Sequence, residues 1–208
     1  MRLSIGVLAL IVLSGNVLRA QPVEVGVLGG IRATDDFSGS LASESKRYIV
    51  GPTVDIRLPK RFSVEVDALY QRFGFNSYWN RGHDGATVWE RTNSWEFPVI
   101  LKYHLPVRLM HPFVGIGYAP RIINGTDVSS GEYRYEYQFS NVRSTTSYPV
   151  TQGVVVSGGV SWGAGHFWFT PEARYTYWTA PYVSGYGYGG TGGSNQNEVL
   201  VLLGIRWH

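Results

Sequence analysis

The stretch RFSVEVDALYQRF, residues 61–73, decides the fold. Its alternate residues form an apolar set, which is Phe62, Val64, Val66, Ala68 and Tyr70. The positions between them carry mostly polar side chains, including Glu65 and Asp67. A period of two is that of a β-strand, whose successive side chains point to opposite faces of a sheet. The strand therefore has one apolar and one polar face, and the rest of the chain must decide which of them points inward.

Seven further stretches show the same period of two. They are residues 22–32, 47–58, 94–104, 112–122, 153–162, 167–178 and 197–207. With the opening stretch they make eight strands of about ten residues, the length that crosses a bilayer when tilted. Eight strands suffice to close a barrel, and single-chain bacterial membrane barrels have an even number. We therefore predict an all-β fold, an eight-stranded antiparallel up-and-down transmembrane β-barrel.

The N-terminus has the features of a secretory signal peptide. An arginine second in the chain precedes an apolar run that ends near Leu13, and a small residue, Ala20, stands before Gln21. The run is too short for a membrane-spanning helix, and a buried N-terminal helix would need an amphipathic pattern that the segment lacks. We predict cleavage between Ala20 and Gln21, which divides the chain into a signal peptide, 1–20, and one barrel domain, 21–208.

The connections between the predicted strands alternate between long and short. The long ones are residues 33–45, 74–91, 125–149 and 180–195, and the short ones are residues 59–60, 106–111 and 163–166. Outer-membrane barrels have short periplasmic turns and long extracellular loops, whereas a soluble sandwich gives no reason for such alternation. The opening strand is therefore expected to run outward from the periplasmic rim.

Aromatic residues gather near the ends of the apolar strand faces, while Val, Ile, Leu and Ala fill the middle. They are Tyr48, Phe62, Tyr70, Trp95, Tyr103, Tyr118, Trp162, Phe167, Tyr175, Tyr177 and Trp207. Trp and Tyr prefer the membrane interface because the ring is apolar and its tip forms hydrogen bonds. In the alternative, a soluble lipocalin-like barrel, these rings would fill the core and would not be sorted to strand ends. We predict that the apolar faces contact lipid.

The opposite faces carry the charged residues, which we predict to form a network inside the barrel. They are Asp55, Arg57, Glu65, Asp67, Glu96, Lys102, Arg121, Glu172, Arg174, Glu198 and Arg206. An Arg or Lys facing lipid at the midplane would cost about 2–4 kcal/mol, whereas inside the barrel opposite charges pair. An eight-stranded barrel has room for side chains but for no wide channel. The candidate cationic partners of Glu65 and Asp67 are Arg174, Lys102, Arg57 and Arg206. A path for protons or a substrate is the alternative role of these charges.

Composition excludes several function classes. The chain has no cysteine, so it has no disulfide, no thiolate metal site and no cysteine nucleophile. Its five histidines lack zinc-ligand spacing, and a net charge of +3, spread singly, does not suggest a nucleic-acid partner. We predict no catalytic, metal-binding or cofactor-binding residues and no cofactor. The pair His83–Asp84 in a long loop is the one candidate for half of a catalytic site.

Four pieces of the chain resemble the outer-membrane protein β-barrel domain family, the small single-chain barrels related in shape to OmpA, OmpX and OmpW. The pieces are WEFPVILKYHL (95–105), HPFVGIGYAPR (111–121), PEARYTYW (171–178) and the closing GIRW (204–207). The resemblance covers about residues 21–208 and implies an integral outer-membrane protein of a Gram-negative-type bacterium, frequently without a known activity. Such barrels usually end on an aromatic residue that the assembly machinery recognises, whereas here Trp207 is followed by His208.

From these features we expect a structural barrel in the outer membrane, without catalysis, whose long loops contact an extracellular ligand or surface. Its expected partners are outer-membrane lipids and, during biogenesis, the barrel assembly machinery. A narrow conduit for small or hydrophobic molecules, as in the OmpW group, is one alternative, and a lipid-modifying enzyme is another. Pro52, Pro98 and Pro171 fall within predicted strands, where proline removes a hydrogen-bond donor, so we expect them at bulges or near a rim.

Overall fold

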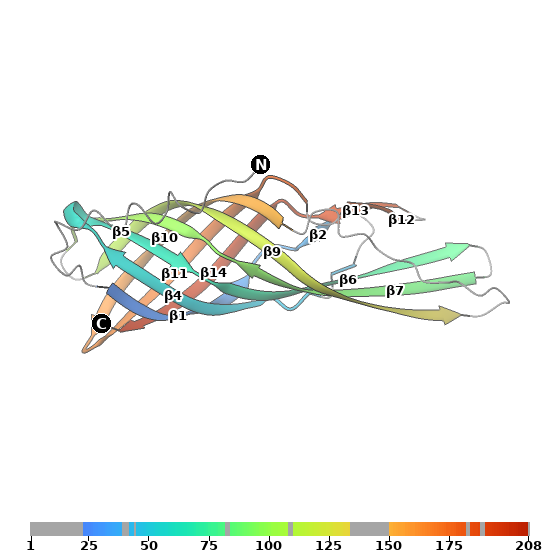
Figure 1. Cartoon of the computed structure of the whole chain (residues 1–208), viewed down its shortest axis with the longest axis horizontal. Helices are drawn as coiled ribbons and strands as arrows, with labels where there is room; N and C mark the ends of the chain where they lie inside the picture. The colour runs from blue at the N-terminus through green and yellow to red at the C-terminus, as the bar shows by residue number, and fades with distance from the viewer. Residues whose placement is uncertain are drawn as a thin grey trace, which may run out of the picture.

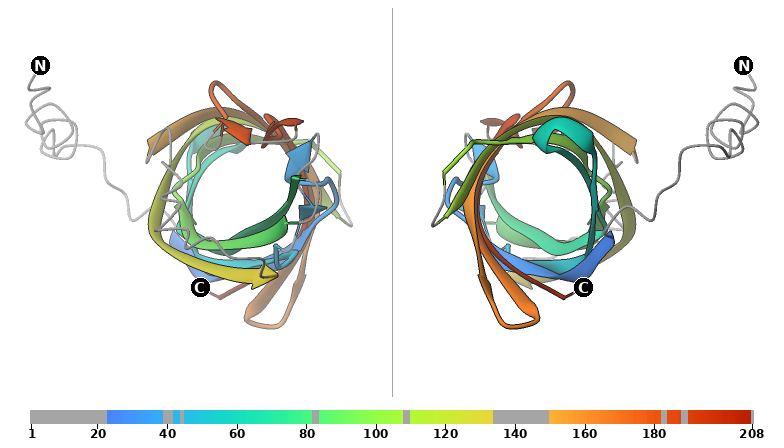
Figure 2. Two further views of the ribbon diagram at one scale, coloured as in Figure 1. Left: turned by 90° about the vertical axis from the view of Figure 1, so that its right-hand side faces the viewer. Right: turned by 90° about the vertical axis from the view of Figure 1, so that its left-hand side faces the viewer.

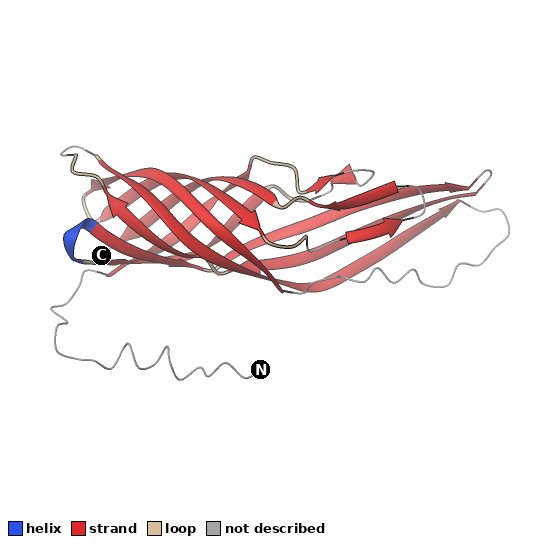
Figure 3. Ribbon diagram, turned by 90° about the horizontal axis from the view of Figure 1, so that it is seen from above, coloured by secondary structure: helices blue, strands red, loops and turns tan. Residues whose placement is uncertain are grey.

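The chain folds as an elongated, closed barrel in a computed structural model (Figures 1 and 3). The structure describes residues 23–38, 42–43, 45–81, 84–107, 110–133, 150–181, 184–187 and 190–207. The predicted signal peptide and its cleavage site lie outside these residues. In the described part, no helix is long and apolar enough to cross a membrane.

Ten strand segments build the barrel wall. They are β1 (Val23–Arg32), β4 (Tyr48–Arg57), β5 (Phe62–Asp67), β6 (Leu69–Arg81), β7 (Asp84–Glu96), β8 (Val99–His104), β9 (His111–Tyr133), β10 (Val150–Ala164), β11 (Phe167–Trp178) and β14 (Asn197–Trp207). Since β5 continues into β6 and β7 into β8, the ten segments make eight wall strands. The predicted eight-stranded antiparallel barrel is confirmed, and Figure 2 shows the ring end-on.

The two ends of the chain close the ring. The first strand, β1, pairs with the last, β14, from Val25 opposite Trp207 to Arg32 opposite Leu200. The other edge of β1 pairs with β4, and the β9–β10 pairing completes the circle. All of these pairs are antiparallel. The backbone groups of the wall therefore bond to neighbouring strands on both sides, as hydrocarbon surroundings require.

Short connections lie together at one end, which we call the short-turn rim. There the 3₁₀ turn η1 (Pro59–Arg61) joins β4 to β5, and a turn at Gly165 joins β10 to β11. The opposite end, where the long connections emerge, is the long-loop rim.

At the long-loop rim the strands extend much further than predicted. Residues 74–81 and 84–91, expected as parts of a loop, belong to strands β6 and β7, which pair from Leu69 opposite Glu96 to Arg81 opposite Asp84. Part of the predicted loop 125–149 also belongs to β9, which pairs with β7 as far as Tyr133. These three strands project beyond the barrel (Figure 1). The prediction of loops was wrong because it relied on apolar alternation, and a strand that leaves the membrane no longer needs an apolar face.

Two of the predicted loops also contain short strands that meet each other. Here β12 (Ser184–Gly187) pairs with β13 (Gly190–Ser194), and β13 pairs with β2 (Phe37–Ser38). A further short strand, β3 (Ala42–Ser43), pairs with β6. Residues from the first and last long connections thus lie side by side at the mouth of the barrel.

Prolines occupy places where the ladder of hydrogen bonds is interrupted. Pro98 lies in the break between β7 and β8, and its carbonyl accepts a hydrogen bond from the Asp67 N–H at 3.1 Å. Ala68, in the matching break between β5 and β6, donates to the Pro52 carbonyl at 3.1 Å. Pro171 stays paired with β14 but falls in a gap of the β10–β11 ladder. In this way the missing N–H groups are accommodated without opening the ring.

The backbone conformation of the η1 turn indicates a substitution that should stabilise the folded protein. Lys60 and Arg61 adopt positive φ angles of 62° and 69°, which cost a side-chain-bearing residue roughly 1–2 kcal/mol each. Lys60→Gly should raise the free energy of unfolding, because glycine adopts this conformation without a clash. The expected gain is only about 0.5–1 kcal/mol, because glycine also loses more conformational entropy on folding. Urea unfolding in lipid vesicles, followed by tryptophan fluorescence, measures the change.

The matched control is Gly165→Ala, because Gly165 also has a positive φ of 65° and an added Cβ would meet no neighbouring atom. This variant should be less stable than the wild type. A Lys60→Gly protein that unfolds at lower urea than the wild type would contradict the assignment of strain to this turn.

Candidate functional site in the barrel lumen

The wall strands alternate between lipid-facing and inward-facing residues, and the predicted charged residues lie on the inward side. Nearly all of them are buried, namely Asp55, Glu65, Asp67, Glu96, Lys102, Arg121, Glu172, Arg174, Glu198 and Arg206. Arg57, near the short-turn rim, is partly exposed. The structure groups these residues into two clusters at different heights of the barrel.

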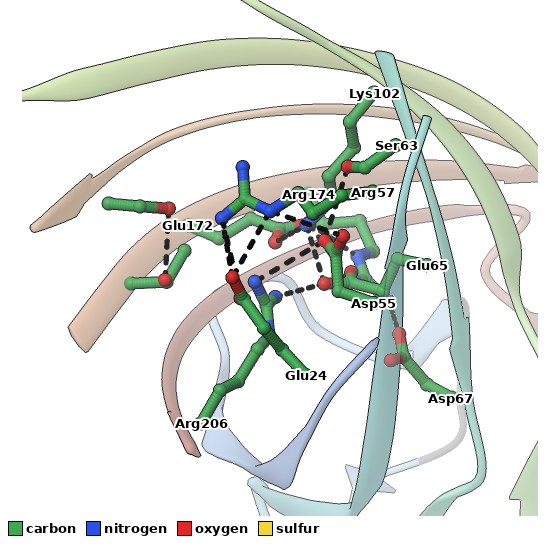
Figure 4. Close-up of polar contacts among 12 residues, drawn as sticks. Glu24, Asp55, Arg57, Ser63, Glu65, Asp67, Lys102, Glu172, Arg174 and Arg206 are labelled. Carbon is green, nitrogen blue, oxygen red and sulfur yellow. Dashed lines mark hydrogen bonds and ion pairs between the residues drawn. The ribbon is translucent and has the colours of Figure 1, made fainter. Parts of the chain in front are cut away.

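The first group, the short-turn cluster, is built around Glu65 on β5 (Figure 4). Its carboxylate receives Lys102 Nζ from β8 at 2.7 Å and Arg174 Nη2 from β11 at 3.0 Å. Arg206 on β14 binds Oε2 of the same carboxylate, the oxygen that Lys102 also contacts. Through these ion pairs the Glu65 side chain connects four wall strands, β5, β8, β11 and β14.

Arg174 is the cationic counterpart of Glu65 in this cluster. It contacts Asp67 at 2.9 Å and Glu172 at 2.9 Å in addition to Glu65. Lys102 also reaches Glu172, at 2.8 Å. Each buried charge therefore has an opposite partner, which is the condition under which charges survive in a low-dielectric interior.

The cluster extends to the short-turn rim through two further ion pairs. Arg57 binds the Glu24 carboxylate at 3.0 Å, and Arg206 binds Asp55 at 3.4 Å. Glu24 was not among the predicted lumen residues, although it alternates with the valines of β1 and this pattern alone places it inward. We define the short-turn cluster as Glu24, Asp55, Arg57, Glu65, Asp67, Lys102, Glu172, Arg174 and Arg206.

The second group, the long-loop cluster, surrounds Arg121 on β9. Its guanidinium contacts Glu96 at 2.8 Å, binds Glu198, and lies 3.5 Å from the ring centroid of Trp178. The Trp178 N–H donates to Glu198 at 2.8 Å, and the Gln71 amide donates to Glu96 at 2.5 Å.

Closer to the mouth lies a pair that sequence reasoning missed. Arg32 and Asp36 form an ion pair at 3.3 Å, and Arg32 lies 4.8 Å from the centre of the Phe73 ring. Arg32 has the inward parity of β1, so alternation could have found it, whereas Asp36 belongs to a connection without periodicity. We define the long-loop cluster as Arg32, Asp36, Gln71, Glu96, Arg121, Trp178 and Glu198.

An apolar layer separates the two clusters. On β1, the inward Leu28 stands between Glu24 near the short-turn rim and Arg32 near the long-loop rim. On β6, Leu69 follows Asp67 on the same inward face. The layer consists of Leu28, Ile49, Leu69, Leu200 and Leu202 on one side and Ile100, Ala119 and Val155 on the other, where it packs against Trp178 of the long-loop cluster. The described lumen is therefore filled at three successive levels.

One contact beside the short-turn cluster joins two residue types found in catalytic pairs, but it lacks the arrangement of such a pair. Ser63 Oγ lies 3.0 Å from His104 Nε2, on the neighbouring strands β5 and β8. Ser63 is fully buried and hydrogen-bonds Asp55 at 3.2 Å, and His104 Nδ1 has no partner in the described part of the chain. A nucleophile needs access to substrate and a base that a third group orients, so this contact fits a structural role. The other candidate, His83, lies outside the described residues.

Metal binding also finds no support in the geometry. Among the residues that the structure describes, no group of three or more His, Asp or Glu side chains is arranged to hold a metal ion.

The outward faces carry the aromatic residues in two bands. Toward the long-loop rim lie Tyr48, Tyr70, Trp95, Tyr118, Tyr175 and Tyr177, and toward the short-turn rim lie Phe62, Tyr103, Trp162, Phe167 and Trp207. Rings pack in pairs across strands, with centroids 5.4 Å apart for Tyr70 and Trp95. Exposed aliphatic side chains such as Ile116 and Val201 occupy the surface between the bands. This is the outside of a transmembrane barrel.

A closed wall with an apolar outside and a paired, charged interior defines an integral membrane β-barrel. The family model of the outer membrane protein beta-barrel domain matches residues 19–177, so the chain belongs to this family. The protein is an outer-membrane barrel of the small eight-stranded type.

A search of solved structures finds small outer-membrane proteins at low sequence identity. The outer membrane protein OprG from Pseudomonas aeruginosa is 13% identical, with 90% of this chain and 96% of that chain covered and a TM-score of 0.52. Neisserial surface protein A is 14% identical, with 89% and 96% covered and a TM-score of 0.45. The likeness to OprG supports the fold alone. No curated protein matches the sequence.

The ion-pair geometry predicts that the short-turn cluster stabilises the barrel unevenly. Arg174→Met should lower the free energy of unfolding by about 3–5 kcal/mol, because it leaves buried carboxylates without their shared cation. Arg57→Met, which breaks a partly exposed pair, should cost only about 1 kcal/mol. Urea titration in vesicles with the gel shift between folded and unfolded forms measures both, and equal losses would contradict the central role of Arg174.

Proposed function

We propose that the protein is a closed, non-conducting and non-catalytic barrel that presents a β-sheet and loops at the cell surface for contact with an extracellular ligand or surface. The observation that carries this proposal is the combination of a filled lumen with three strands that continue past it. Wall strands β6, β7 and β9 extend well beyond the barrel as a paired sheet. Binding residues are commonly carried on such projecting segments above a rigid scaffold.

The filled lumen argues against conduction. An ion would have to cross the apolar layer, where it would lose its hydration without gaining a partner, at a cost of several kcal/mol. At the long-loop mouth, residues that include Arg32 and Glu198 line a partly open cavity of about 10 Å³, which is room for about one water molecule. A conduit for small or hydrophobic molecules would need a continuous opening instead.

The same packing argues against catalysis in the lumen. The charged groups of both clusters are engaged with one another, and the Ser63–His104 contact is closed to substrate. We therefore assign the lumen charges a structural role.

The proposed orientation places the short-turn rim in the periplasm and the long-loop rim outside the cell. It rests on the difference between the rims, since short periplasmic turns and long extracellular loops are the usual arrangement of such barrels. In this orientation, outer-membrane lipids surround the aromatic bands, and the assembly machinery would act on the chain from the periplasm.

Conductance measurements distinguish a closed barrel from a conduit. The wild-type protein in planar bilayers should give no reproducible conductance steps, because the apolar layer blocks hydrated ions. Steps that change in size in Arg121→Ala but not in the lipid-facing control Val201→Ala would overturn the proposal and favour the conduit.

Cysteine labelling tests the orientation, and the absence of native cysteine makes the background clean. A membrane-impermeant maleimide added to intact cells should label Ser130→Cys on the β9 extension but not Lys60→Cys in the η1 turn. Lysis should then expose Lys60→Cys to the reagent. Labelling of Lys60→Cys in intact cells would reverse the proposed orientation.

A further inference from the structure

Basic side chains gather on the outer surface of the barrel just beyond the aromatic band of the long-loop rim. Arg72 is two residues past Tyr70 on β6 and shares its outward face, since alternate strand residues point the same way. In the β6–β7 register, Arg91 lies opposite Gly74, next to Arg72. The Lys46 N–H donates to the Arg72 carbonyl at 3.1 Å, which brings Lys46 to the same height. We define these three residues, Lys46, Arg72 and Arg91, as the basic rim patch.

The height of this patch suits the headgroup level of a membrane. The Tyr70 and Trp95 rings pack together on the outer face and mark the interface. A strand rises about 3.4 Å per residue and is tilted by roughly 40° in such barrels, so Arg72 lies about 5 Å above Tyr70. By the same reckoning Arg91 lies about 10 Å above Trp95. Both heights are just outside the hydrocarbon boundary.

Two members of the patch have no acidic partner among the described side chains. Lys46 is exposed and Arg72 half-buried, and neither forms an ion pair with the residues that the structure describes. Arg91 lies opposite Asp127 in the β7–β9 register, so we treat it as a flanking member. Arg47, the neighbour of Lys46, binds Asp35 at 2.7 Å and does not add to the patch.

Among the residues that the structure describes, the patch occupies one side of the rim. The outward residues at the long-loop ends of β1, β10, β11 and β14 include Ile31, Val150, Tyr177 and Val199, none of them charged. A general coating of positive charge for solubility would not be confined to the β4–β6–β7 side. The restriction to one side indicates a localised ligand at that place.

We propose that the basic rim patch binds the phosphate groups of a lipid in the outer leaflet of the outer membrane. Arg72 supplies a planar fork of N–H donors that fits a phosphate, and Lys46 adds a mobile point charge beside it. The acyl chains of the same lipid lie along the outward Tyr70–Trp95 pair below. The choice of leaflet rests on the orientation proposed above.

A binding experiment with a matched charge control tests the patch. The probe is lipid A, a phosphorylated glycolipid, added to the detergent-solubilised barrel, and native mass spectrometry measures the affinity. Lys46→Gln/Arg72→Gln should bind about 30-fold more weakly, since each basic residue near a membrane surface contributes about fivefold. Lys60→Gln/Arg61→Gln removes the same charge at the opposite rim and should bind as the wild type does. Lipid A stripped of its phosphates should bind the wild type and the double variant equally weakly.

Three results would overturn the proposal: an unchanged affinity of the Lys46/Arg72 variant, equal losses in both double variants, or equal affinity for the dephosphorylated lipid. The gel shift on heating shows whether each variant is folded. If the double variant does not fold, Lys46→Gln alone, at an exposed position before β4, should still lose about fivefold. If Lys60→Cys is labelled in intact cells, the proposed orientation is wrong and the bound lipid belongs to the inner leaflet, but phosphate binding by the patch is unaffected. The proposed orientation and the proposed lipid site can therefore fail separately.

Discussion

Within a bilayer, each backbone N–H and C=O must find its partner in a neighbouring strand, and the rest of this structure depends on that constraint. It forces the sheet to close, which the pairing of β1 with β14 accomplishes. Closure with eight strands leaves an interior that side chains fill. Charged side chains inside must then bind one another, as Glu65 and Arg174 do at 3.0 Å. Even the prolines follow the rule, because they stand where the ladder is already broken.

The paired lumen charges also select the register of the strands. A slip of one residue would turn every side chain of a strand to the opposite face. On β5 such a slip would carry Glu65 into lipid and bring Val64 or Val66 into the lumen, leaving Arg174 and Arg206 without their shared carboxylate. Correct register is therefore favoured twice, by the lipid outside and by the ion pairs inside.

The parts of the fold within the membrane were predictable from sequence because lipid enforces a sharp contrast between the two faces of a strand. That contrast identified the eight wall strands and the inward positions of residues such as Glu65. Beyond the apolar band both faces meet water, and the extensions of β6, β7 and β9 were taken for loops. The shared lumen also limited the partners of Glu65 to a few cations, and the structure brings Lys102, Arg174 and Arg206 to it. The remaining candidate, Arg57, binds Glu24 instead, which alternation alone could not tell because every inward charge shares the same lumen. Asp36 lies outside any strand, where alternation carries no information.

The pairing of the first strand with the last also sets the order of events during assembly. The edge of β1 has no permanent partner until β14 arrives, and β14 is the final strand to be synthesised and exported. The barrel has the high contact order of a ring, so its closure is a late and slow step. Until then an unpaired edge invites wrong pairing with other chains. The last strand therefore does more than complete the wall, because its pairing with β1 also removes the open edge of the sheet.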